Sequence, residues 1–204
     1  MHRGTLYIIS APSGAGKTSL VKALCKQMTG IGLSVSHTTR PQRPGEVDGV
    51  DYWFVDKSAF AQKQEEGDFL ESAQVFDNFY ATSRSAVETQ LLRGEDVILE
   101  IDWQGARQVR EVMPEQLSVF ILPPSREVLE TRLRKRGQDS DEVIARRMQD
   151  ATQEISHHDE YQYLIINDDF ETALSELSCL VNAQRLKTVR AVEENQLLIR
   201  SLLE

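Results

Sequence analysis

One stretch of this chain, residues 6–20, constrains the fold more than any other. It reads LYIIS, an apolar and β-prone run, then APSGAGKT, and then the beginning of a helical pattern. Its middle part matches the phosphate-binding pattern G-x-x-x-x-G-K-[ST] at every fixed position except the first, where Ala11 stands. A strand that runs through small residues into a helix leaves free backbone N–H groups at the positive end of the helix dipole. We therefore expect an α/β protein that holds phosphate oxygens here.

The side chains of this loop suit the same chemistry. Gly14 and Gly16 allow the backbone to curve close to an anion without a Cβ clash. Lys17 is expected to reach the outer phosphates, and the hydroxyl of Thr18 to take a place on Mg²⁺. An ordinary glycine-containing turn with an exposed lysine is the alternative, but the strand before it and the helix after it favour a nucleotide site. The candidate site is the whole loop, Ala11, Pro12, Ser13, Gly14, Ala15, Gly16, Lys17 and Thr18.

Composition narrows the class of protein and its partners. The 204 residues, 40% hydrophobic and 27% charged, describe a globular chain rather than a disordered or fibrous one. A formal net charge of −9 would repel a nucleic-acid polymer, although a mononucleotide can still be held locally. No apolar run approaches the roughly 20 residues of a membrane span, and no signal peptide is recognisable. We expect a cytoplasmic protein with no membrane or polymer partner, and with Cys25 and Cys179 reduced.

Hydrophobic periodicity predicts a core in which strands and helices alternate. The predicted strands are residues 6–10, 33–36, 97–102, 117–122 and 163–166, with helices between them. Asp168 and Glu171 form a capping box at the start of a C-terminal helical region. This pattern predicts a three-layer α/β/α core around a parallel sheet. The core is expected to comprise residues 1–36, 85–124 and 158–204.

An insertion at residues 37–84 interrupts this alternation. It is predicted to be rich in β-structure, with strands at 50–55, 69–75 and 79–82 and a helix at 58–66. Two guanidinium groups and two phenol hydroxyls gather in it and can surround a second phosphate group. They belong to Arg40, Arg43, Tyr52 and Tyr80. Taken singly, each is more simply a surface arginine or a core tyrosine with a solvated tip.

A charged helical arm at residues 125–157 is the second interruption, with a break at Gly137. Arg132 and Arg136 lie one turn apart on one face, and Arg146 and Arg147 follow on the next helix. Arginines on a mobile arm can close over a triphosphate and neutralise the transferring group. A solvated, salt-bridged helix face is the alternative.

Acidic residues end the strand predicted at 97–102. In phosphate-loop proteins a neighbouring strand ends in a carboxylate that organises Mg²⁺ or its water ligands, and Glu100 and Asp102 are placed for this. A solvated strand end is the alternative. The segment from Asp102 to Gly105 also matches the D-x-x-G of a GTPase switch, but the sequence contains no N-K-x-D guanine motif, which disfavours a switch protein.

Taken together, these residues resemble the guanylate kinase family along nearly the whole chain. The resemblance is carried by residues 11–18, 36–46 (SHTTRPQRPGE), 51–52 (DY), 69–71 (FLE), 78–80 (NFY), 101–105 (IDWQG) and 166–169 (INDD). It implies an enzyme that transfers the γ-phosphoryl group of ATP to GMP with the help of Mg²⁺. It also implies that residues 37–84 are a GMP-binding domain and that residues 125–157 are a lid.

The resemblance assigns roles to individual residues. GMP would be held by Ser36, Arg40, Arg43, Tyr52, Glu71, Tyr80, Thr82 and Asp102. Catalysis would depend on Lys17, Arg40, Arg132, Arg136 and Arg147. Asn167 falls where the family places a residue near the adenine. Guanine presents N1–H and an amino group side by side, which the carboxylate of Glu71 can accept with both oxygens, whereas adenine offers no such pair.

Some features depart from the family pattern. Ala11 and Ala81 stand where Gly is common in the family, and Glu100 replaces a frequent Asp. If Ala81 required a positive φ, the cost would be about 1 kcal/mol. Two alternatives to a guanylate kinase remain. One is a sugar-phosphate kinase on the same scaffold, and the other is a non-catalytic guanylate-kinase-like module that binds a phosphorylated protein segment. The loop lysine and Glu71 favour the enzyme, and self-association is left open.

Overall fold

A parallel sheet forms the centre of the computed structural model, which describes residues 2–75, 77–135 and 140–204. Its strands lie in the order β2 (Ile31–Leu33), β7 (Asp96–Glu100), β1 (Leu6–Ser10), β8 (Leu117–Leu122) and β9 (Tyr163–Ile166). Strand β1 pairs with β7 on one side and β8 on the other. The loop that follows β1 therefore opens between two neighbouring strand ends, where ligands bind in sheets of this kind.

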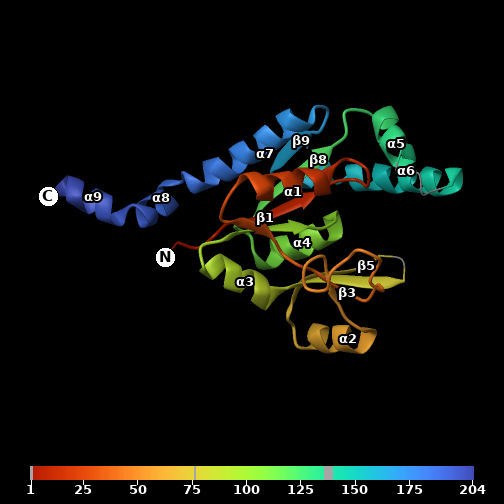
Figure 1. The fold of residues 1–204 in the computed structure, drawn as a ribbon, viewed down its shortest axis with the longest axis horizontal. Coiled ribbons are helices and arrows are strands. Elements are labelled where there is room, and N and C mark those ends of the chain that lie inside the picture. Colours follow the sequence, from red (N-terminus) through yellow and green to blue (C-terminus); the bar gives the residue numbers. More distant parts are fainter. Residues whose placement is uncertain (1, 76, 136–139) are drawn as a thin grey trace.

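Helices cover both faces of this sheet (Figure 1). Alternate residues of β1 enter two separate cores, because successive side chains of a strand point to opposite faces. Tyr7 and Ile9 pack with α1 (Lys17–Gln27) and α7 (Phe170–Arg185). Leu6 and Ile8 pack with α3 (Arg84–Leu92) and α4 (Trp103–Val112). The predicted three-layer α/β/α core is confirmed.

A second, mixed sheet lies within the insertion. Its order is β4 (Trp53–Phe54), β3 (His37–Thr38), β6 (Asn78–Ser83) and β5 (Phe69–Val75). Helix α2 (Lys57–Glu65) packs on it through Phe60, whose ring lies 4.9 Å from that of Phe69 and 5.5 Å from that of Phe79. The insertion thus has its own aromatic cluster.

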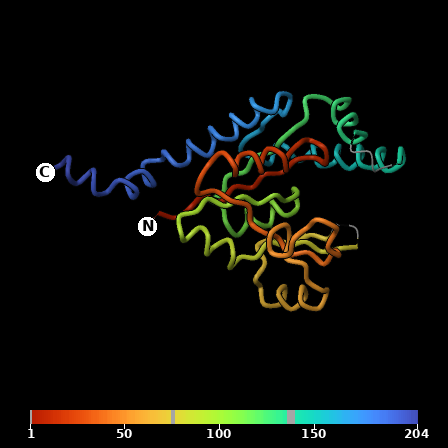
Figure 2. The backbone as a smooth tube through the Cα atoms, in the orientation of Figure 1, coloured from red at the N-terminus to blue at the C-terminus, as the bar shows by residue number. Residues whose placement is uncertain are grey.

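The charged arm is a pair of helices, α5 (Arg126–Lys135) and α6 (Asp141–Ile155). Their contact is a small apolar cluster of Leu129, Leu133, Ile144, Met148 and Ala151. A short 3₁₀ turn, η1 (His158–Glu160), follows, and after α7 the chain continues into α8 (Thr188–Glu194) and α9 (Gln196–Leu203). These last two helices extend away from the body of the molecule (Figure 2). No helix in the described parts of the chain is long and apolar enough to cross a bilayer.

Several predicted boundaries were wrong. The strand predicted at 33–36 is β2, at Ile31–Leu33, and the strand predicted at 50–55 is reduced to Trp53–Phe54 because tight turns take up the residues before it. The strand predicted at 97–102 ends at Glu100. Asp102 is instead the N-cap of α4, a helix that the periodicity did not reveal, and its carboxylate accepts from the N–H of Gly105 at 2.8 Å.

The cap of α7 also differs by one residue from the prediction. Asp169, not Asp168, is the N-cap, and its carboxylate accepts hydrogen bonds from the N–H and the hydroxyl of Thr172, both at 2.8 Å. Ala81 lies inside β6, paired with His37 and Ser72, so its backbone is extended. The positive φ that would have strained an alanine there does not arise. Cys25 and Cys179 are free thiols, as expected.

Candidate active site

The phosphate-binding loop connects β1 to the first turn of α1. Gly14 has φ +95° and Gly16 has φ +97°, a left-handed conformation that favours glycine. Asn167, at the carboxyl end of β9, donates its side-chain N–H to the carbonyl of Ala15 at 2.7 Å. A Cβ at Gly16 would clash with that side-chain nitrogen. Asn167 is 4% exposed and supports the loop backbone; the predicted contact with adenine remains a prediction.

A cavity of about 280 Å³ lies over this loop. It is lined by Ala11, Pro12, Ser13, Gly14, Gly16, Lys17, Thr18, Glu100, Ile101, Asp102 and Glu154. Burial lowers the pKa of Lys17, while the carboxylates of Glu100, Glu154 and Asp102 act in the opposite direction. The cavity thus combines a half-buried ammonium with several carboxylates. A polyanion that brings a divalent cation with it can bind to such a mixture of charges.

A second cavity, of about 340 Å³, lies between the central sheet and the insertion. Its lining includes Ser36, Tyr52, Glu71, Tyr80 and Asp102, which are five of the residues assigned to GMP by the resemblance. Glu100, Ile101 and Asp102 line both cavities, so the two spaces adjoin at the end of β7. Two ligands bound there would meet at the acidic strand end.

Glu71 lies at the buried end of this second cavity. It is 5% exposed, and its carboxylate accepts a hydrogen bond of 2.7 Å from the Thr82 hydroxyl. Burial raises the pKa of Glu71 to about 7; the Thr82 hydrogen bond lowers it, and the nearby charge of Asp102 raises it further. The other carboxylate oxygen lies close to α4, since a Cβ at Gly105 would be only 2.9 Å from it. Glycine at 105 therefore leaves room for the acid.

The two arginines of the insertion are placed differently. Arg40 lies with its guanidinium 5.5 Å from the centre of the Tyr52 ring, and it forms an ion pair of 2.7 Å with Glu46. The backbone N–H of Arg43 also bonds to Glu46, at 2.8 Å. Neither arginine lines the two cavities. Arg40 therefore contacts one of the predicted tyrosines, whereas Arg43 is joined to Arg40 through Glu46.

The arm contributes arginines at the loop. Arg132 donates to the carbonyl of Asn167 at 3.0 Å and to that of Ala15 at 3.4 Å. Arg147 lines a broad cavity of about 580 Å³ together with Ser13 and Asp102. Arg146 belongs to the same cavity. Arg136 lies outside the described residues.

Glu46, Gly105 and Glu154 were missed by the sequence analysis. Glu46 holds the loop that carries Arg40 and Arg43. Glu154 follows Arg147 by seven residues, two turns of the same helix, so its spacing was the available signal that both share one face. Gly105 follows the N-cap Asp102 by one turn, and this place was the available sequence signal for it. Its contact with Glu71 depends on the fold, which brings β5 against α4.

The donor set suits a magnesium ion held partly by phosphate. Glu100 has a buried carboxylate oxygen with no hydrogen-bond partner in the structure, and such an acceptor is satisfied by a cation or its water. Thr18 lines the same cavity. Within the described residues, no three acidic, histidine or cysteine side chains are close enough together to hold a metal by themselves. A bound Mg²⁺ would therefore need nucleotide oxygens as ligands.

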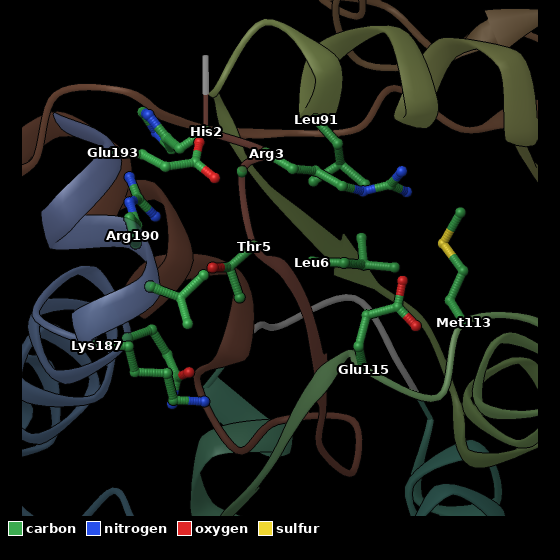
Figure 3. A pocket seen from close by; sticks show the side chains of 13 residues that line it. His2, Arg3, Thr5, Leu6, Leu91, Met113, Glu115, Lys187, Arg190 and Glu193 are labelled. Carbon is green, nitrogen blue, oxygen red and sulfur yellow. The ribbon is translucent and has the colours of Figure 1, made fainter. Parts of the chain in front are cut away.

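A third feature, a cavity of about 320 Å³, lies at the amino ends of the central strands. Figure 3 shows Arg3, Lys187 and Arg190 around it, with Glu115 and Glu193 interspersed. It is lined by the residues that precede β1 and β8 rather than by those that follow them. This mixed-charge hollow lies at the amino ends of the strands, away from the loop at residues 11–18.

Comparison with known proteins agrees with this geometry. A model of the guanylate kinase family matches residues 3–184. The chain belongs to the guanylate kinase family. A guanylate kinase of Chromohalobacter salexigens is 61% identical over 201 residues, covering 98% of this chain and 94% of the relative. That of Methylococcus capsulatus is 60% identical over 203 residues, the full length of both.

A solved structure supports the same assignment. The crystal structure of a guanylate kinase from Anaplasma phagocytophilum superposes with a TM-score of 0.76 at 35% identity, covering 93% of this chain and 90% of that one. Guanylate kinases are nucleoside monophosphate kinases, so the chain is a phosphotransferase. The family resemblance drawn from the sequence is confirmed.

Proposed function

We propose that this guanylate kinase transfers the γ-phosphoryl group of ATP to the 5′-phosphate of GMP, giving ADP and GDP. One observation carries the proposal: the cavity over the phosphate loop and the cavity that contains Glu71 adjoin at Glu100, Ile101 and Asp102. A triphosphate on the loop and a monophosphate whose base reaches Glu71 would meet end to end at that point. In-line transfer needs such a meeting.

The base of GMP would be recognised by Glu71. Its buried carboxylate, positioned by Thr82, can accept from N1–H and the amino group of guanine together. Adenine would leave one carboxylate oxygen unpaired in a buried place, which costs about 1–3 kcal/mol or more for a charged group. Ser36, Tyr52 and Tyr80 would then hold the monophosphate, and Arg40 and Arg43 would reach it from the loop beside them.

Transfer requires positive charge rather than a base. The acceptor oxygen of GMP is already ionised at neutral pH, so the obstacle is repulsion between two anions. Lys17 and the loop amides would hold the donor phosphates, with Arg132 and Arg147 reaching the same place from the arm. Closure of the insertion and of the arm would exclude water. Mg²⁺, bound at Thr18 and near Glu100 or Asp102, would supply further positive charge to the phosphate oxygens.

The assay that tests this proposal measures ADP formation from ATP in the presence of GMP, AMP, CMP and UMP in turn. We expect turnover with GMP and rates lower by two orders of magnitude or more with the others, because only guanine matches Glu71. A sugar phosphate as the preferred acceptor, or no transfer to any acceptor, would contradict the proposal and favour one of the alternatives raised by the sequence.

Three wider expectations accompany this function. The division into a core, a GMP-binding domain at 37–84 and a lid at 125–157 is proposed from the second sheet and from the α5–α6 pair. A cytoplasmic location stays a prediction. Self-association stays open, and the exposed leucines of α9, such as Leu197 and Leu202, are a reason to measure the molar mass in solution.

A further inference from the structure

A carboxylate from the arm lies on the phosphate loop. Glu154, in the last turn of α6, accepts a hydrogen bond from the backbone N–H of Ser13 at 3.3 Å. It lines the loop cavity and is attracted to Lys17 across it. Burial raises the pKa of Glu154, while Lys17 and the Ser13 N–H lower it. An anionic group of the protein thus uses the donors that a phosphate would use.

The position of this carboxylate is built into the fold. The end of α6 is tethered to α4, because the ring of His157 stacks on Trp103 with 3.7 Å between ring centres. Arg107 donates to Glu160 at 2.8 Å just beyond it. At the other side of the loop, a Cβ on Gly14 would lie 3.0 Å from the side chains of Leu129 and Leu133 of α5. Both arm helices therefore touch the loop, and α6 does so through a charge.

The charges around Lys17 decide between two roles for Glu154. Glu100 and Asp102 already face this lysine from β7 and the residues after it. One role would be to bind a metal ion together with these two acids. Within the described part of the chain, however, the three carboxylates are not close enough together to form a metal-binding group. Beside a triphosphate, Glu154 instead adds like-charge repulsion at a distance of a few ångströms. The carboxylate and a phosphate oxygen also cannot share the Ser13 N–H.

We propose that Glu154 is a built-in competitor of the nucleotide: it holds α6 on the loop through Ser13 and Lys17, and the phosphates of ATP must displace it. This inference rests on the proposed function, since it assumes that ATP phosphates occupy the loop. Glu154 is thereby a positioning residue that links the place of the arm to ATP binding. Its presence weakens the affinity for ATP and makes release of the arm part of the binding step.

The test is the substitution Glu154→Gln, which keeps the size of the side chain and removes its charge. We expect the dissociation constant for ATP, measured by calorimetry without GMP, to fall about three- to tenfold, which corresponds to roughly 0.6–1.4 kcal/mol. Inorganic tripolyphosphate should show the same tightening, because the effect concerns phosphates and not the base. The gain should shrink at 0.5 M salt if it comes from charge. The KM for GMP should change less than about twofold.

Asp150→Asn is the matched control, because Asp150 lies one turn earlier on α6 and lines the broad cavity but not the loop cavity. It removes the same charge and should leave ATP affinity within about twofold. Weaker ATP binding in Glu154→Gln, or the same gain in both variants, would overturn the inference while the GMP assay of the wild-type enzyme still stood. Failure of the wild-type chain to bind ATP or tripolyphosphate would overturn the inference and the proposed function together.

Discussion

Lys17 shows what a single residue contributes to this site. Its ammonium is half-buried among three carboxylates, and burial lowers its pKa. Lys17→Met should reduce turnover by at least a thousandfold, because the donor phosphates lose a charge for which no neutral side chain substitutes. Stability should change little, since the buried charge was itself costly. A coupled assay measures the turnover, and thermal unfolding measures the stability. Lys22→Met, at an exposed position of α1, is the control. Near wild-type rates for Lys17→Met would contradict the mechanism.

Glu71 should give GMP binding a pH dependence. Only the ionised carboxylate accepts two hydrogen bonds, and the pKa of Glu71 is about 7 in the free protein. The KM for GMP should therefore fall as the pH rises from 6 to 8 and level off above the pKa. Glu71→Gln should raise the KM for GMP at least tenfold at pH 8, reduce the discrimination against other monophosphates, and lose this pH dependence. Unchanged nucleotide selectivity in the variant would refute the role of Glu71.

The same acid should affect stability in the opposite direction. A folded-state pKa of about 7 lies above the value of about 4.3 expected in the unfolded chain, so the folded state binds the proton more tightly. The contribution of Glu71 is most favourable below pH 4 and is lost as the pH rises through 7. Glu71→Gln should therefore gain stability relative to wild type between pH 5 and pH 8, by up to roughly 3 kcal/mol. Urea unfolding at the two pH values measures this; a constant difference would argue against the raised pKa.

At the scale of elements, the insertion depends on the packing of α2 on the second sheet. Phe60 is 2% exposed and packs with its ring tilted against those of Phe69 and Phe79. Phe60→Ala should destabilise the protein by about 3–5 kcal/mol through the cavity that it leaves. Because β5 and β6 carry Glu71 and Tyr80, the KM for GMP should rise while ATP binding to the loop is preserved.

Calorimetric ATP binding and GMP kinetics of the Phe60 variant separate these effects. Phe170→Ala is the control, because Phe170 begins α7 and is 36% exposed; its cost should stay below about 1 kcal/mol. Equal losses in ATP and GMP binding would mean that α2 supports the whole molecule rather than the insertion alone.

At the scale of the whole molecule, Asp96 joins the amino end of β7 to the C-terminal helices. Its side chain is fully buried and pairs with Arg185 at 2.9 Å and Arg190 at 2.7 Å. It also accepts from the N–H of Thr5 at 2.8 Å, so three distant segments meet at one carboxylate. Removal of one partner from such a group leaves buried charge uncompensated.

Asp96→Ala should therefore lower the free energy of unfolding by about 3–5 kcal/mol. The kcat of the folded enzyme should stay within about twofold, because Asp96 lies at the amino end of β7, whereas the phosphate loop follows the carboxyl end of β1. Glu194→Ala is the matched control: Glu194 also pairs with Arg190 but is 38% exposed, and its loss should cost less than about 1 kcal/mol. Chemical denaturation of both variants decides the question, and equal costs would show that burial of Asp96 is not what matters.

Local sequence determined the parts of this protein whose signals are local. The strand and glycine-rich loop at residues 6–18 predicted β1 and the turn into α1, because turns and strand alternation depend on neighbours in the chain. The predicted residue Asp102 was also found at the site, although on a helix cap rather than in a strand.

Tertiary structure decided the contacts between residues far apart in sequence. Glu154 reaches Ser13 across 141 positions, Asn167 reaches Ala15 across 152, and Asp96 gathers Arg185 and Arg190. No periodicity encodes such pairs, because they arise only when the parallel sheet brings its strand ends together and the arm folds back over them. The sequence alone thus predicted a phosphate site at this loop, and the fold determined which distant charges lie around it.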